Sequence, residues 1–266
     1  MSSRGLRKKD VHRIQLPGSF LVQLLYASRV GLQMGHLAKD DAEDLADAFP
    51  KKTIRGDDLE ELVHDDKFFV RLDTCSLKDA LIGEGYIKDV KDLWTRLATS
   101  ARGMSGIRSL RDWDKSMPMY MYLFPWREDM RTELEYRVYC PPPLAQGNDS
   151  GKSAAAKLSA ISQYKWHTPW CHATSESEHE GIARKLLKSC EVLHQMIMAS
   201  SAMTERLRNR GFVFDVVEDP GTLDVQSIEL NGFGAMTGCG ACLFHWVRDA
   251  KLLYGLEEKV EVRVTI

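Results

Sequence analysis

The sequence predicts an α+β fold, built as one large domain or two small ones from its 266 residues. Two observations support this prediction. Short runs rich in aromatic and β-branched residues alternate with longer segments in which apolar residues recur at helical spacing. In addition, the last third of the chain contains a strong β-hairpin pattern, and a hairpin pairs its strands antiparallel.

The hairpin is predicted over residues 212–230, where two apolar-rich runs flank an Asp-Pro-Gly turn. A turn centred near the following Thr places Asp215 opposite Glu229, and Asn231 lies on the same face because side chains alternate along a strand. Two carboxylates and an amide oxygen then converge, which is a hard ligand set suited to Mg²⁺ carrying the phosphates of a nucleotide. The alternative is a half-exposed hairpin whose polar residues face water.

The remaining elements follow from local patterns. Further strands are predicted at residues 67–72, 119–124, 134–139 and 158–163, and helices within 17–48, 87–111 and 175–210. The charged residues 51–66 are interpreted as solvated surface. We expect an N-terminal helical and α+β domain over residues 1–118, and a C-terminal domain that contains the hairpin over residues 119–266.

Composition limits the classes of function. The formal charge of −2 gives no bulk electrostatic reason to expect a nucleic-acid or membrane partner. The basic residues within 88–111 are either a solvated face or a local nucleic-acid contact. No segment has the pattern of a signal peptide or a spanning helix, so the six cysteines are expected to be reduced and the protein cytoplasmic.

Two polar segments have features of a phosphate-binding site, but only the first keeps that interpretation. After the strand at 67–72, Arg71 and Lys78 could place cations on a phosphate, although a helix cap by Ser76 explains the same residues equally well. The segment Gly147-Asn-Asp-Ser-Gly-Lys-Ser153 superficially resembles a phosphate loop, but it has one residue too few between its glycines and lies between two predicted strands.

Several motifs together resemble the ATP-grasp fold, and within it the cell-division-cycle protein 123 family. The motifs are FFVRLDTCSLKDA, LEYRVY with AISQYKW, and FVFDVVED with IELNGFGAMTGCGACLFHW. The resemblance covers about residues 67 to 250, and its last block is the specific part. It implies two α+β lobes with mainly antiparallel sheets that enclose a central cleft for ATP.

The resemblance also implies roles for individual residues. Asp215, Glu229 and Asn231 correspond to the ligands of Mg²⁺–ATP, and Arg71 falls where the family has a lysine that reaches the phosphates. Arg137 matches the arginine of the Glu-aromatic-Arg strand, and Trp126 follows the strand expected to bind adenine. Together with Lys78, these residues are the expected cofactor-binding set.

The chain departs from the family pattern at several of these positions. An aspartate becomes Glu229, a proline becomes Gly232, a Thr-Asp step becomes Thr237-Gly238, and a lysine becomes Arg71. The acidic N-terminal region of the family and much of its C-terminal tail have no counterpart in this sequence. These changes suggest a paralogue with a new function.

We therefore expect an enzyme that joins amino-acid units through an amide bond in small-molecule biosynthesis. One form is ATP-dependent ligation with ATP and Mg²⁺. The other is aminoacyl-tRNA-dependent cyclodipeptide synthesis, with tRNA as a partner, in which ATP is lost and the acids transfer protons or hold a cationic amino-acid side chain. In either form Asp215, Glu229 and Arg137 are the expected catalytic residues. The alternative is an ATP-binding assembly chaperone for the γ subunit of translation initiation factor 2, as in the family.

Overall fold

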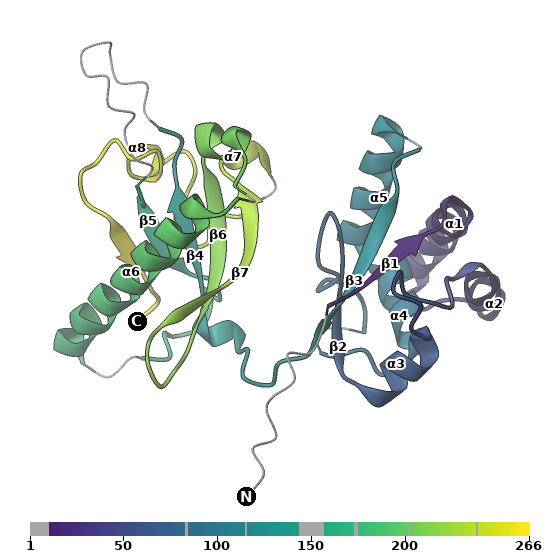
Figure 1. Ribbon diagram of the computed structural model, residues 1–266. Coiled ribbons are helices and arrows are strands. Elements are labelled where there is room, and N and C mark those ends of the chain that lie inside the picture. The colour runs from purple at the N-terminus through teal and green to yellow at the C-terminus, as the bar shows by residue number, and fades with distance from the viewer. Residues whose placement is uncertain are drawn as a thin grey trace, which may run out of the picture. The chain divides into compact units, whose positions relative to one another are not determined.

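A computed structural model describes residues 11–82, 85–114, 116–143, 157–172, 175–201, 203–237 and 239–266. The chain divides into two compact units, Met1–Arg127 and Glu128–Ile266 (Figure 1). The predicted α+β class is confirmed. The segment Gly147–Ser153 and Gly238 lie outside the described residues.

The first unit is built on a three-stranded antiparallel sheet with the order β1–β3–β2. The strands are β1 (His12–Leu16), β2 (Phe68–Leu72) and β3 (Met119–Pro125). Because β3 is the central strand of this sheet, the unit ends after Arg127, whereas a boundary after residue 118 was expected. β3 was expected in the second unit because its partner β1, which pairs Ile14 with Met121, was not predicted.

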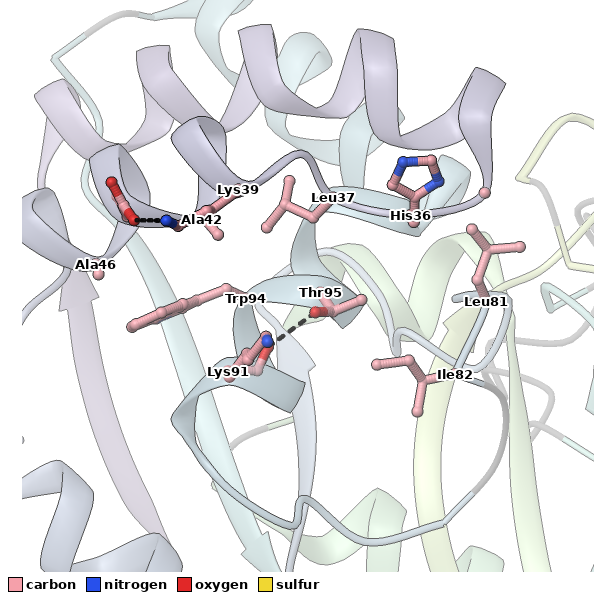
Figure 2. A pocket seen from close by; sticks show the side chains of 12 residues that line it. His36, Leu37, Lys39, Ala42, Ala46, Leu81, Ile82, Lys91, Trp94 and Thr95 are labelled. Atoms are coloured by element: carbon pink, nitrogen blue, oxygen red, sulfur yellow. Dashed lines mark hydrogen bonds and ion pairs between the residues drawn. The ribbon is translucent and has the colours of Figure 1, made fainter.

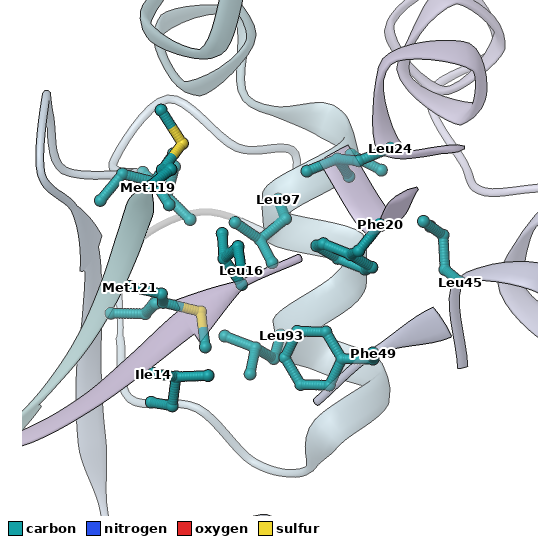
Figure 3. Close-up of a cluster of buried hydrophobic side chains, with 14 of the residues drawn as sticks. Ile14, Leu16, Phe20, Leu24, Leu45, Phe49, Leu93, Leu97, Met119 and Met121 are labelled. Carbon is teal, nitrogen blue, oxygen red and sulfur yellow. The ribbon is translucent and has the colours of Figure 1, made fainter. Parts of the chain in front are cut away.

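One face of this sheet packs against helices. The helices are α1 (Gly18–Met34), α2 (Lys39–Ala48), α3 (Leu59–Asp65), α4 (Val90–Thr99) and α5 (Ala101–Trp113). Inward side chains of the strands, such as Ile14 and Met121, meet Phe20, Leu93 and Leu97 in a continuous core (Figure 3).

Two predictions about these helices are corrected. Residues 51–66 are not only solvated surface, because α3 buries Leu59 and Val63. The predicted helix over 87–111 is interrupted at Ser100, whose side-chain oxygen accepts a hydrogen bond from the Gly103 backbone N at 2.9 Å and thereby begins α5.

The second unit contains a five-stranded sheet with the order β7–β6–β4–β5–β8. The strands are β4 (Glu135–Cys140), β5 (Ala160–Gln163), β6 (Phe212–Glu218), β7 (Val225–Gly232) and β8 (Glu261–Arg263). All neighbours are antiparallel except β5 and β8, which are parallel. A short 3₁₀ helix, η1 (Thr132–Leu134), leads into β4.

The two faces of this second sheet are covered differently. Helix α6 (Glu176–Ala199) lies across one face, where Leu186 and Cys190 pack in a core with Tyr136 and Phe214 (Figure 1). We call this the helix face. The predicted helix over 175–210 is in fact two helices, because α7 (Glu205–Arg210) begins at a new cap, in which the Thr204 side chain accepts from the Leu207 backbone N.

The opposite face carries a mixture of apolar and charged side chains. Tyr139 and Val213 pack there with Phe244 and with Leu253 of α8 (Ala250–Leu253). The described helices include none that is both long and apolar enough to cross a membrane.

Candidate functional site

Three neighbouring strands place the predicted site residues in one row. Arg137 of β4 is paired with Asp215 of β6, and Asp215 is paired with Glu229 of β7. Asn231 lies two residues beyond Glu229 and therefore points from the same face. The predicted pairing of Asp215 with Glu229 is confirmed, and the register shifts between Asp215 and Val216, nearer the turn. We call the surface that bears Arg137, Asp215, Glu229 and Asn231 the site face.

Arg137 and Asp215 form a buried, two-point ion pair. Nε of Arg137 donates to Oδ1 of Asp215 at 2.8 Å, and Nη2 donates to Oδ2 at 2.8 Å. The two side chains are only 8% and 3% exposed. Nη1 of the same guanidinium donates to the Gly240 backbone oxygen at 2.7 Å. The guanidinium is thus held on three sides, and its orientation is fixed.

Asn231 joins the two carboxylates. Its Nδ2 atom donates to Oδ2 of Asp215 at 3.3 Å and to Oε1 of Glu229 at 3.2 Å. A shared donor reduces the repulsion between two acids that lie directly opposite on a sheet. Glu229 and Asn231 are half-buried, whereas Asp215 is 2% exposed. Glu229 is therefore the carboxylate of this row that solvent reaches.

Burial and charge act in opposite directions on this ion pair. Burial raises the pKa of Asp215, the hydrogen bonds and charge of Arg137 oppose that rise, and the charge of Glu229 adds to it. Burial alone would lower the pKa of Arg137, but Asp215 outweighs burial and raises it. The pKa of Asp215 consequently depends on both Arg137 and Glu229.

The segment after β7 closes one side of the row. Thr237, at the end of the 3₁₀ helix η2 (Ala235–Thr237), donates through its hydroxyl to the backbone oxygens of Gly232 and Gly234 at 3.0 and 2.7 Å. A Cβ atom on Gly232 would lie only 3.0 Å from a Thr237 methyl carbon. A glycine at position 232 therefore has a local reason, which is the close approach of this threonine.

Two cysteines, Cys239 and Cys242, lie near the ion pair. Burial raises the pKa of Cys239 to about 11 and also raises that of Cys242. Both thiols are therefore protonated at neutral pH, and a protonated thiol is a poor nucleophile.

Tyr164 is a site residue that the sequence analysis missed. Its ring lies 5.0 Å from the guanidinium carbon of Arg137. Ser162 is paired with Arg137, and Tyr164 lies two residues further along the same chain direction. Strand alternation from the Ile-Ser-Gln motif could have placed Tyr164 on the site face.

The other predicted residues belong to the first unit. Arg71 lies on β2 and forms an isolated bridge with Ser76. The expected helix cap at Ser76 does not form; Asp79 instead accepts from the Ser100 hydroxyl and the Arg102 backbone N at the start of α5. Lys78 is half-buried in the connection between these elements.

Trp126, just after β3, packs edge-on against Tyr86 with ring centroids 6.1 Å apart. Its indole nitrogen is buried and has no hydrogen-bond partner within the part of the chain that the structure describes. The expected binding residues are therefore divided: Arg71, Lys78 and Trp126 are in one unit, and the residues of the site face are in the other.

The site face fits a cation better at Glu229 than at Asp215. Both oxygens of Asp215 already accept hydrogen bonds from Arg137, and a metal there would lie beside a guanidinium. Among the described residues, no group of three His, Cys, Asp or Glu side chains could hold a metal ion. Glu229 and Asn231 are half-buried and carry the oxygen atoms that suit a hard cation.

The first unit also contains a cavity of about 620 Å³ between α2, α4 and the Leu81–Ile82 segment (Figure 2). Leu37 and Trp94 contribute apolar walls, and Lys39 and Lys91 lie at its edge. None of the predicted site residues lines this cavity.

Comparison with known proteins identifies the fold. No family model matches the chain, and no curated protein matches it in sequence. Among solved structures, Cdc123 from Schizosaccharomyces pombe is 16% identical, with a TM-score of 0.61 over 97% of this chain and 89% of that chain. A C-terminally truncated form of the same protein gives a TM-score of 0.60 with the same coverage. The chain therefore has a Cdc123-like α+β fold.

Proposed function

We propose that this protein is an enzyme that joins amino-acid units through an amide bond, with Glu229 in contact with the substrate. The observation that supports the proposal is the row Arg137–Asp215–Asn231–Glu229, in which a fixed, buried ion pair supports one half-buried carboxylate. A preorganised acid of this kind can hold a cationic amine or accept its proton.

In amide formation the attacking amine loses a proton as its nitrogen bonds to the acyl carbon. The leaving group is phosphate if ATP has activated the acyl group, and the 3′-terminal hydroxyl of tRNA if an aminoacyl ester supplies it. Glu229 would orient the ammonium or the cationic side chain of one amino-acid unit. Asp215 and Arg137 act as positioning residues, because they fix Asn231 and, through it, Glu229.

In the ATP-dependent form, Glu229 with Asn231 would hold the Mg²⁺ of the nucleotide. Calorimetric titration with Mg²⁺–ATP measures whether this binding exists. We expect Glu229→Gln to weaken it about tenfold or more.

A product assay by mass spectrometry tests the proposal. The full chain is incubated with amino acids and either Mg²⁺–ATP or aminoacyl-tRNA, and amide products are measured. We expect Glu229→Gln to reduce product by about 100-fold or more. Glu191→Gln, on the exposed side of α6, is the matched control and should be unchanged. Equal product from Glu229→Gln, or no product with either donor, would reject the proposal.

The second candidate is an assembly chaperone for translation initiation factor 2, the function of the family that the sequence resembles. The fold comparison supports this candidate more directly than it supports amide formation, because the likeness to Cdc123 extends over 97% of the chain. A pull-down with the purified γ subunit separates the two. Retention of that subunit together with an absence of amide product would favour the chaperone.

A further inference from the structure

The cavity of about 620 Å³ in the first unit lies where α2 presents small side chains. Ala42 and Ala46 are four residues apart on α2, so they face the same side of the helix. Both line the cavity, and their size leaves open a space that larger residues would fill (Figure 2). Cavities that bind small molecules in proteins have volumes of about 300–1,000 Å³. This one is therefore large enough for a small molecule.

Another wall of the cavity is apolar and in contact with water. Leu81 and Ile82 are 54% and 39% exposed, and both line the cavity together with Leu37 (Figure 2). The backbone N of Leu81 donates to Oγ1 of Thr99 at 3.3 Å, which ties this segment to α4. A bound apolar group would cover side chains that water otherwise contacts, and such burial is favourable.

Trp94 of α4 adds an aromatic wall. Its ring packs edge-on against Phe49, with ring centroids 6.1 Å apart. Trp94 also lines a second cavity, of about 230 Å³. Its indole nitrogen has no hydrogen-bond acceptor in the part of the chain that the structure describes, so packing alone holds the ring. The lining is thus mostly apolar on both helices.

The charged groups at the edge of the cavity are not balanced. Lys39 is paired with Glu43 at 3.6 Å, and the two side chains are 86% and 67% exposed. Lys91 is also exposed, but no carboxylate of the described residues lies within ion-pair distance of it. His36 is the remaining titratable group of the lining, and its Nδ1 atom lies 3.1 Å from the Met34 backbone oxygen. Lys91 is therefore the cation at this edge that could bind an anion.

We propose that this cavity binds a small amphiphilic carboxylate, such as a medium-chain fatty acid, with its chain between Leu81 and Trp94 and its carboxylate at Lys91. Apolar walls disfavour a sugar or a nucleotide, whose polar groups would lose water without gaining partners. The cation at the edge favours an anionic head group over a neutral one. Lysine carries this charge on a flexible stem, and its methylene groups can also cover the ligand chain.

This binding goes beyond the proposed function. The cavity is lined only by residues of the first unit, and none of the residues of the site face contributes to it. A carboxylate would bind there whether or not the second unit forms an amide. The two proposals can therefore fail separately.

Calorimetric titration of the full chain with octanoate and decanoate tests the inference. We expect decanoate to bind about 15-fold more tightly than octanoate, because the cavity buries two more methylene groups. Decan-1-ol has the same chain without the charge, and it should bind about fivefold more weakly than decanoate or worse.

Two variants separate the charge from the space. Lys91→Met keeps an apolar stem and should weaken decanoate about fivefold or more, with decan-1-ol unchanged. Lys88→Met, at an exposed lysine outside the cavity, is the matched control and should bind like the wild type. Ala42→Phe places a ring in the cavity and should abolish binding of both probes. Its control is Ala101→Phe, at an exposed position of α5, which should leave binding unchanged.

Circular dichroism and the unfolding midpoint verify that each variant is folded. Lys91→Met changes an exposed position, so it decides the question even if Ala42→Phe does not fold. The inference is overturned if the wild type binds neither acid at about 1 mM, if decan-1-ol binds as tightly as decanoate, or if Lys88→Met loses as much binding as Lys91→Met. A dimer of the full chain that Ala42→Phe dissociates would also overturn it, because a second copy would then occupy the cavity. Since only binding is measured, a failure here is distinct from a failure of the amide product assay.

Discussion

The helix face and the site face of the second sheet are made by alternate residues of the same strands, yet they are stabilised by opposite means. On β4, Tyr136 and Val138 pack under α6, while Arg137 between them is committed to a buried ion pair. Apolar burial is favourable by itself, whereas two buried charges must offset a large desolvation penalty. A buried ion pair is thus weak evidence for stability, and its presence here supports a functional role for the site face.

The largest effect on stability is expected from a substitution that removes one partner of the Arg137–Asp215 ion pair. Asp215→Ala leaves the Arg137 guanidinium buried without a counter-charge, and we expect the free energy of unfolding to fall by about 3–5 kcal/mol. Chemical denaturation measures this change. The double variant Arg137→Met with Asp215→Leu should recover most of the stability, because apolar side chains of similar size replace the charges. A double variant as unstable as Asp215→Ala would contradict the interpretation.

A substitution on the helix face should lower the free energy of unfolding by somewhat less. Leu186→Ala removes a side chain that is 1% exposed between α6 and the sheet, and we expect a loss of about 3 kcal/mol. Val192→Ala, on the same helix but 52% exposed, should change stability by less than about 0.5 kcal/mol. Unlike Asp215→Ala, Leu186→Ala should leave ligand binding at the site face intact once the protein is folded. Loss of that binding would remove the functional distinction between the two faces.

Another ion pair, at the edge of the site face, should contribute less because solvent reaches it. Asp249 accepts from both terminal nitrogens of Arg263 at 2.9 and 3.0 Å, and the two side chains are 20% and 31% exposed. The hydrogen bonds to Arg263 lower the pKa of Asp249 below its ordinary value. We expect Asp249→Asn to cost about 1 kcal/mol at neutral pH.

The sign of the pH dependence follows from that lowered pKa. The contribution of Asp249 is complete above its unfolded pKa of about 3.9, and it is lost as the pH falls through the lower folded value. The difference in unfolding free energy between wild type and Asp249→Asn should therefore be constant from neutral pH to about pH 5 and shrink below pH 4. A difference that stays constant down to pH 2 would show that Arg263 does not stabilise the carboxylate.

The hairpin could be predicted from sequence because the residues that determine it lie close together in the chain. The turn and the alternation along residues 212–231 predict the pairing of Asp215 with Glu229, although the observed ladder also contains a register shift between Asp215 and Val216 that the pattern did not indicate. The partner of Asp215 could not be predicted in the same way, because Arg137 lies 78 residues earlier in the chain. The resemblance gave Arg137 a role in cofactor binding, whereas the structure shows it bound to Asp215.

The missed elements share a physical cause. β1 is a five-residue edge strand with two exposed polar side chains, and β8 has only three residues. Short edge strands depend on their neighbours for stability, so their own sequences carry little signal. Missing β1 also displaced the expected domain boundary, because β3 is held in the first unit between β1 and β2.

Substitution of Glu229 is expected to change stability least, which contrasts most sharply with substitution of Asp215. It is half-buried, and Glu229→Gln keeps an oxygen that can accept from Asn231. We expect the unfolding free energy to change by less than about 0.5 kcal/mol. Removing this charge also removes one cause of the raised pKa of Asp215, so that pKa should move toward its ordinary value in an NMR titration. If Glu229→Gln instead unfolds the protein as Asp215→Ala is expected to do, Glu229 is part of the structural ion-pair network. It would then not be the substrate-contacting group that the proposed function requires.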